Sequence, residues 1–135
     1  IFFNKSLADE FAYRCKQGGQ LASKMRFLAA QWMGLMKNNV WLRNAKHAND
    51  CAAMLESGFR KIPGVELMFP REANSVFVTM PPKALDLIRE KGWKFYTFIG
   101  VGGARFMCTW DTKEETVKAF LCDVAASVEE AGKQG

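Results

Sequence analysis

The sequence contains a single histidine, His47, and this scarcity excludes most of the usual acid–base catalytic sets. No second imidazole is present to share a metal ion, and no Ser-His-Asp or Cys-His arrangement can be assembled around His47 alone. No pair of carboxylates stands out by its spacing either. His47 lies in a polar helical stretch, so we expect it to be a solvated helix residue. The sequence therefore predicts no metal site and no catalytic residue in this chain.

Cysteine is also sparse, and its spacing excludes two further classes of protein. The four cysteines lie far apart along the chain, at positions 15, 51, 108 and 122. They form neither a CxxC motif, which zinc sites and redox sites use, nor the dense pattern of a disulfide framework. We therefore expect a reducing, cytoplasmic setting.

Long apolar runs are missing as well. No segment approaches the roughly 20 apolar residues that a membrane helix needs, so no membrane association is expected. The chain opens on Ile1-Phe2-Phe3, with neither a methionine nor a basic segment ahead of an apolar one. This start argues against a signal peptide and suggests the tail of a buried strand in a longer protein.

Acidic residues are absent from residues 11–49, although this segment contains seven lysines and arginines. Such a local charge favours an anionic partner, which could be a phosphate, a carboxylate or a nucleic acid. One alternative function is therefore a basic α+β module that binds nucleic acid. That alternative requires exposed aromatic residues for stacking on a sheet face beside the basic segment.

The residue patterns that are present predict an α+β fold. Helical spacing of apolar residues and strand-like runs follow one another in the order helix, helix, helix, strand, strand, helix, strand, strand, helix. The expected elements are helices at 6–17, 20–37, 40–61 and 82–91, strands at 65–69, 75–80, 93–98 and 104–110, and a last helix capped by Asp111 and Glu114. We expect a small antiparallel sheet with helices packed on one face. The predicted parts are residues 1–39, a connecting helix at 40–61, and an α+β domain at 62–135.

Arg105 is the most informative single residue. Alternation along the fourth strand puts Ala104, Phe106, Cys108 and Trp110 on one face and Arg105, Met107 and Thr109 on the other. The strand follows a glycine-rich stretch, Ile99–Gly103, which we expect to be a turn. An arginine at this position can bind a carboxylate through two parallel hydrogen bonds. The alternative is a strand arginine paired with a neighbouring Glu or Asp.

A second group of cations flanks the glycine turn Gly18-Gly19. Arg14 and Lys16 precede the turn, and Lys24 and Arg26 follow it near the start of the next helix. The N-terminus of a helix attracts anions, so Lys24 could help to hold one there. The same cations could equally do no more than solvate a helix hairpin.

Three blocks of the sequence, in this order, closely resemble low-specificity threonine aldolases of the β-eliminating lyase group. They are Arg14–Gln31, Trp93–Ile99 and Gly103–Thr112. The resemblance covers essentially the whole chain, and it identifies the chain as a C-terminal portion of such an enzyme. It implies the C-terminal domain of a fold-type-I enzyme that uses pyridoxal phosphate, with residues 1–39 ending the large domain.

The resemblance also implies an activity and site residues. Such enzymes cleave β-hydroxy-α-amino acids such as threonine into glycine and an aldehyde, and they work as tetramers or dimers. By this resemblance Arg105 binds the substrate carboxylate, Lys16 lies at the rim of the substrate cleft, and Lys24 reaches toward the phosphate of the cofactor.

The resemblance further implies that the main catalytic groups are missing. The Schiff-base lysine of the family, its ring-stacking histidine and its pyridinium aspartate belong upstream of the strand that ends at Phe3. Lys5 follows that strand and is not the Schiff-base lysine. We therefore expect this chain to have no aldolase activity alone.

Overall fold

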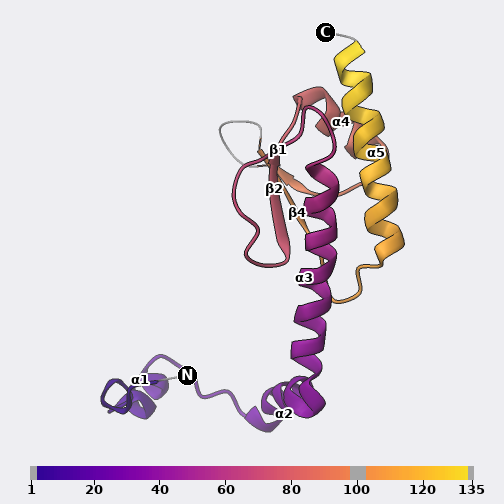
Figure 1. Ribbon diagram of the computed structural model, residues 1–135. Helices are drawn as coiled ribbons and strands as arrows, with labels where there is room; N and C mark the ends of the chain where they lie inside the picture. Colours follow the sequence, from indigo (N-terminus) through magenta and orange to yellow (C-terminus); the bar gives the residue numbers. More distant parts are fainter. Residues whose placement is uncertain (1–2, 98–102, 134–135) are drawn as a thin grey trace. The chain divides into compact units, whose positions relative to one another are not determined.

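The computed structural model describes residues 3–97 and 103–133 and consists of two compact units, Ile1–Val40 and Trp41–Gly135. Its secondary structure confirms the predicted α+β class, with helices and a small antiparallel sheet (Figure 1). Most of the predicted glycine turn, at residues 99–102, and the first two residues of the predicted initial strand lie outside the described residues. The domain boundaries expected from the sequence remain a prediction for the complete protein.

The first unit is built from short helices. It contains η1 (Lys5–Leu7), α1 (Phe11–Gln17), α2 (Met25–Met36) and η2 (Lys37–Asn39), and none of them has a buried residue. The predicted helix start at Ser6 is wrong, because Asn4 caps η1 and Glu10 adopts a left-handed φ of 61° immediately before α1. The break expected at residues 38–39 is confirmed, since both asparagines have a positive φ.

The second unit contains a four-stranded antiparallel sheet. Its strands are β1 (Glu66–Leu67), β2 (Ser75–Thr79), β3 (Tyr96–Thr97) and β4 (Gly103–Met107), and their spatial order is β1-β2-β4-β3. The two central strands, β2 and β4, are rich in Val, Phe and Ala and pair over five residues. The edge strands, β1 and β3, are only two residues long. The strand β3 pairs with the outer side of β4.

Three helices cover one face of this sheet. They are α3 (Val40–Phe59), α4 (Pro82–Glu90) and α5 (Glu114–Lys133). Phe59 of α3 lies at the centre of the core, with its ring centroid 5.4 Å from that of Phe106 on β4 and 6.1 Å from that of Phe120 on α5. The buried face of α3 includes Ala48 and Ala52 and continues into Leu55 and Phe59. Burial of apolar surface in this core is the main force that holds the second unit together.

The predicted strands are shorter in the structure than in the sequence pattern, and the one expected at 65–69 is reduced to Glu66–Leu67. Of the strand expected at 93–98, the described residues 93–97 form a strand only at Tyr96–Thr97, because the Trp93 indole Nε1 turns toward α5 and donates a hydrogen bond to Asp123 Oδ2 at 2.8 Å. The strand expected at 104–110 ends at Met107, so Trp110 is exposed and does not share the buried face. The capping box expected at Asp111 is also wrong. Asp111 accepts a hydrogen bond from the Thr109 hydroxyl instead, and α5 begins at Glu114.

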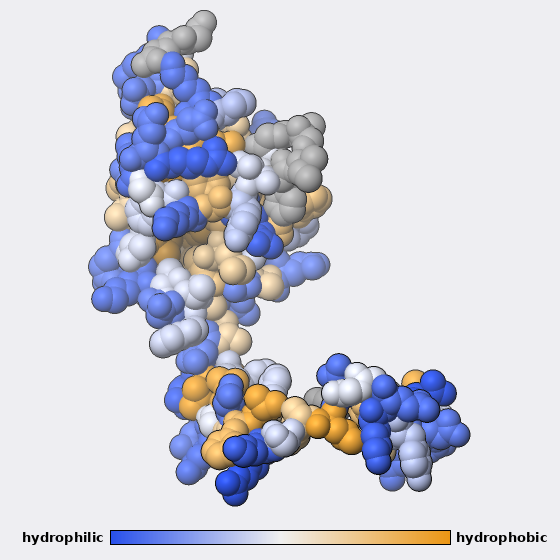
Figure 2. All heavy atoms as spheres, turned by 180° about the vertical axis from the view of Figure 1, so that it is seen from behind, coloured by the Kyte–Doolittle hydropathy of each residue, from blue (hydrophilic) through white to orange (hydrophobic). Residues whose placement is uncertain are grey.

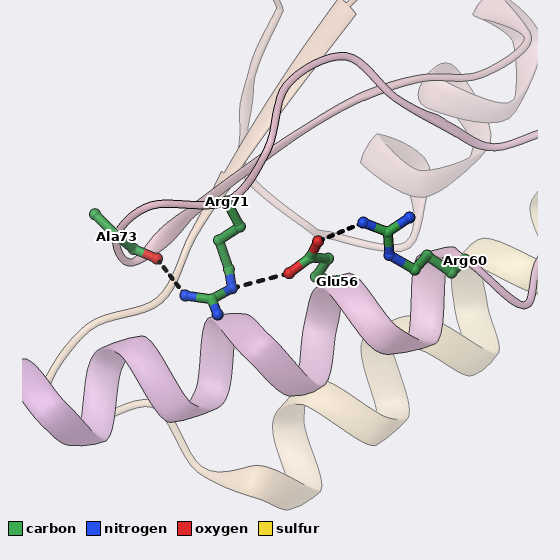
Figure 3. A network of polar contacts seen from close by, with 4 residues as sticks. All are labelled: Glu56, Arg60, Arg71 and Ala73. Atoms are coloured by element: carbon green, nitrogen blue, oxygen red, sulfur yellow. Dashed lines mark hydrogen bonds and ion pairs between the residues drawn. The ribbon is translucent and has the colours of Figure 1, made fainter.

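A polar network fastens α3 to the loop between β1 and β2 (Figure 3). Glu56 accepts hydrogen bonds from Arg60 Nη2 at 2.8 Å and from Arg71 Nε at 3.0 Å, and Arg71 Nη1 donates to the Ala73 carbonyl at 3.2 Å. The side chains of Arg71 and Glu56 are only 23% and 17% exposed. The Arg71–Glu56 ion pair is therefore shielded from solvent more than the other ion pairs among the described residues. The hydrogen bond from Arg60 is the largest influence that holds the pKa of Glu56 below its ordinary value.

Candidate functional site

Arg105 lies in the centre of the four-stranded sheet, on β4. Its neighbours Ala104 and Phe106 are buried toward the helices, at 0% and 6% exposure, so the pleat turns Arg105 to the opposite face. Its cross-strand partners are Phe77 on β2 and Tyr96 on β3. Arg105 is therefore flanked on both sides by an aromatic residue of the same sheet face.

The guanidinium group of Arg105 contacts an aromatic ring and pairs with no acid of the described residues. Its Cζ lies over the Tyr96 ring, 5.3 Å from the ring centroid. Its Nε is buried and has no hydrogen-bond partner in the part of the chain that the structure describes. The alternative expectation, an ion pair with a neighbouring Glu or Asp, therefore finds no partner within residues 3–97 and 103–133.

Arg105 lines a hollow of about 380 Å³. Besides Arg105 and Tyr96, the hollow is lined by Lys94, Phe95 and Met107. Lys94 is exposed and, like Arg105, has no ion-pair partner in the described part of the chain. Two unpaired cations beside apolar walls suit a small anionic ligand that carries an organic side chain.

Lys16 and Lys24 both belong to the first unit, whereas Arg105 belongs to the second. Lys16 is an exposed residue in the last turn of α1. Lys24 is the N-cap residue of α2 and has a left-handed φ of 60°. No acidic residue lies in the first turn of α2, so this helix end carries net positive charge. The site roles of Arg105, Lys16 and Lys24 stay predictions.

His47 differs from the solvated helix residue that the sequence predicted. It is half-buried, and its Nε2 donates a hydrogen bond to the Thr112 carbonyl at 2.7 Å. The Cys51 thiol donates to the same carbonyl at 3.5 Å. These contacts join α3 to the turn before α5, and Thr112 is 65 residues away from His47 in the chain. His47 therefore serves to connect two elements.

The buried cysteines are poor candidates for a nucleophile. Burial raises the pKa of the Cys108 thiol to about 11 and raises the pKa of Cys51 as well. A thiol is nucleophilic only as the thiolate, so both stay inert at neutral pH. Within residues 3–97 and 103–133 no cluster of His, Cys, Asp and Glu could hold a metal ion.

Sequence reasoning missed Tyr96 and Lys94. The strand that contains them was predicted, but the pairing of Tyr96 with Arg105 depends on the register between β3 and β4. The connection between these strands is the glycine-rich stretch, whose length does not fix a register by itself. An antiparallel alignment of the strands predicted at 93–98 and 104–110 was the signal in the sequence that could have paired Tyr96 with Arg105.

No protein-family model matches the chain. Two curated proteins do match it over most of its length, and both are named low specificity L-threonine aldolase. The one from Pseudomonas sp. (strain NCIMB 10558) is 61% identical over 126 residues, which are 93% of this chain and 36% of that protein. The one from Pseudomonas aeruginosa is 56% identical over 124 residues, 92% of this chain and 36% of that protein.

The chain is homologous to one portion of the low specificity L-threonine aldolases. It spans about a third of the length of these curated relatives. The resemblance seen in the sequence is thereby confirmed. The nucleic-acid alternative gains no support, because the aldolase match covers the basic segment that suggested it.

Solved structures agree with this relationship. A threonine aldolase of Leishmania major matches the backbone with a TM-score of 0.76 and 26% identity, over 87% of this chain and 35% of that protein. A sphingosine-1-phosphate lyase of Burkholderia pseudomallei matches with a TM-score of 0.66 and 22% identity, over 78% of this chain and 26% of that protein. The second likeness shows a shared fold only.

Proposed function

We propose that this chain is the C-terminal portion of an aldolase that cleaves threonine-like β-hydroxy-α-amino acids to glycine and an aldehyde. Its part in the reaction is to bind the substrate carboxylate. The observation that carries this proposal is Arg105, which lines a hollow and has no acidic partner among the described residues. The identity to the aldolases of Pseudomonas supports the reaction class.

Arg105 acts by orienting the substrate. A guanidinium can donate two parallel hydrogen bonds to the two oxygens of a carboxylate, which fixes both the position and the plane of that group. Because the carboxylate is attached to Cα, holding it also restricts the direction of the Cα–Cβ bond that breaks. Lys16 is proposed at the rim of the cleft, where an exposed cation attracts the anionic substrate.

The proposed cofactor is pyridoxal phosphate, and among the described residues those at the start of α2 fit its phosphate group. Lys24 and Arg26 stand at the N-terminus of α2, whose first turn contains no acid, and this is a suitable place for a phosphate. When bound, the cofactor supplies the electron sink that allows the Cα–Cβ bond to break. The lysine that attaches it is proposed to lie in the part of the protein that precedes this chain.

The first unit is proposed to contribute contacts with other parts of the complete protein, including a second subunit. Its helices expose large apolar side chains on this chain's surface, which Figure 2 shows as orange patches. In α2 these include Phe27, Trp32 and Met33, at 57%, 64% and 70% exposure. An apolar surface of this kind marks an interaction site in a soluble protein. We therefore propose a homo-oligomer, a dimer or a tetramer.

The proposed location is the cytoplasm. All four cysteines are free, which suits a reducing compartment. No helix among residues 3–97 and 103–133 combines the length and the apolar character needed to cross a membrane.

The test of Arg105 uses the complete protein with its cofactor bound. We expect Arg105→Ala to lower kcat/KM for L-threonine by about a hundredfold, since removing one partner of a buried charged contact costs about 2–5 kcal/mol. The absorbance of the bound cofactor should not change. Arg89→Ala is the matched control, because Arg89 also lies over a ring, that of Phe95 at 4.7 Å, but pairs with Asp86.

Unchanged threonine kinetics in Arg105→Ala would contradict the anchoring role. A separate assay addresses the missing groups: the isolated 135-residue chain, given pyridoxal phosphate, is expected to cleave no threonine. Cleavage by the isolated chain would show that it holds catalytic groups of its own.

A further inference from the structure

Among the described residues of the second unit, Arg89 and Arg105 lie over aromatic rings, and of these two only Arg89 is partnered by an acid. Arg89 Nη1 lies 3.0 Å from Asp86 Oδ1, and its Cζ is 4.7 Å from the Phe95 centroid. Arg105 has the ring of Tyr96 at 5.3 Å and no acid among the described residues. Arg89 also donates from Nη2 to the Thr97 hydroxyl at 3.4 Å, so it is held by an acid, a ring and a hydroxyl, whereas the described contacts leave Arg105 with its ring contact alone.

The register of the sheet places Tyr96 where its ring can contact Arg105. It is the direct cross-strand partner of Arg105 on the antiparallel strand β3, so both side chains leave the same face. The Tyr96 side chain is 73% exposed and packs in no core cluster. Its large apolar ring is therefore not explained by burial in the fold.

The buried Nε of Arg105 is a second reason to assign a role to the contact between Arg105 and the Tyr96 ring. An arginine that used Nε to bind a neighbouring residue would be fixed by a hydrogen bond, but this Nε has no partner among residues 3–97 and 103–133. A ring under the guanidinium attracts its positive charge without using any of its donors. The terminal nitrogens consequently stay available for a ligand on the side of the hollow.

We infer that Tyr96 is a positioning residue for the Arg105 guanidinium and thereby for the substrate carboxylate, an inference that rests on the proposed function of Arg105. The ring keeps the guanidinium in place before the substrate arrives. Because less side-chain freedom is then lost on binding, the carboxylate binds more tightly. The aromatic ring is the part of Tyr96 that acts, and the hydroxyl group is dispensable.

The test compares Tyr96→Phe with Tyr96→Leu in the complete, cofactor-loaded protein. Tyr96→Phe keeps the ring, so the KM for L-threonine should stay within about twofold of the wild type. Tyr96→Leu removes the ring and should raise KM by about two- to fivefold, the change that a cation–π contact at an exposed site provides, with kcat nearly unchanged. Calorimetric titration with glycine, which carries the same carboxylate, should show a matching loss of affinity.

A double-mutant cycle separates this inference from the function it rests on. If Tyr96 acts through Arg105, Tyr96→Leu has no further effect in the Arg105→Ala background. An equal effect in both backgrounds, or no effect of Tyr96→Leu in the wild type, would overturn the role of Tyr96 while leaving that of Arg105 intact. Unchanged kinetics in Arg105→Ala alone would instead overturn the proposed function. A loss in Tyr96→Phe as large as that in Tyr96→Leu would assign the effect to the hydroxyl and contradict the inference.

Discussion

The two units of the chain differ in how their apolar residues are used. In the second unit, helices and sheet bury a continuous core that includes Phe59, Val78 and Ile88. In the first unit no described residue is fully buried, although its helices contain Phe, Trp, Leu and Met. Both units have helical sequence patterns, but among the described residues only the second unit buries apolar side chains in a core of its own. Helix formation by itself therefore does not indicate where a stable domain begins.

The difference also bears on function. The candidate site that the structure describes in detail, around Arg105, lies in the unit that has a core. A carboxylate-binding arginine needs a rigid support, because small displacements weaken its directional hydrogen bonds. The first unit carries Lys16 and Lys24, whose proposed partners belong to the complete protein.

We expect the largest difference between the two units when one aromatic residue of each is replaced by alanine and the free energy of unfolding is measured. Phe59→Ala removes a fully buried ring from the centre of the second unit and should lower the free energy of unfolding by about 3–5 kcal/mol. Trp32→Ala removes a ring of the first unit that is 64% exposed and should change it by less than about 0.5 kcal/mol. Urea denaturation of the 135-residue chain, followed by circular dichroism, measures both. Equal losses would mean that the first unit is also held by a core.

A smaller, pH-dependent effect is expected at Glu56. Its arginine partners hold the pKa of Glu56 below the ordinary value of 4.5. The ionised Glu56 side chain therefore adds its full contribution to the free energy of unfolding above pH 4.5, and this contribution is lost as the pH falls through the lowered pKa. Glu56→Gln should therefore destabilise the second unit by about 1–2 kcal/mol at pH 7, and the difference from the wild type should shrink below about pH 4.5. Denaturation midpoints at pH 7, 5 and 3 check this. A difference that is independent of pH would show that the charge of Glu56 is unimportant.

The sequence predicted much of the second unit because its local signals and its packing agree. The buried positions of α3 and α5 follow helical spacing, and Ala104, Phe106 and Cys108 follow strand alternation. The errors occur where distant residues compete with the local pattern. Trp93 leaves the strand to bond Asp123, and His47 is drawn to Thr112. Neither of these partners is close in sequence.

The candidate site shows the same limit. Arg105 could be selected from the sequence because an arginine in an apolar strand is conspicuous, and the resemblance gave it a role. Tyr96 could not be connected with it, since that connection depends on a register that the sequence leaves open. The role of Lys16 rests on the resemblance alone, and that of Lys24 rests on the resemblance and on its place at the N-terminus of α2.

The most direct test of the account is a crystal structure of the complete protein with its cofactor and glycine bound. The account predicts that the two carboxylate oxygens of glycine lie about 2.7–2.9 Å from the terminal nitrogens of Arg105, with the Tyr96 ring still beneath the guanidinium. A glycine carboxylate held by other residues, with Arg105 paired to a Glu or Asp from elsewhere in the protein, would contradict it.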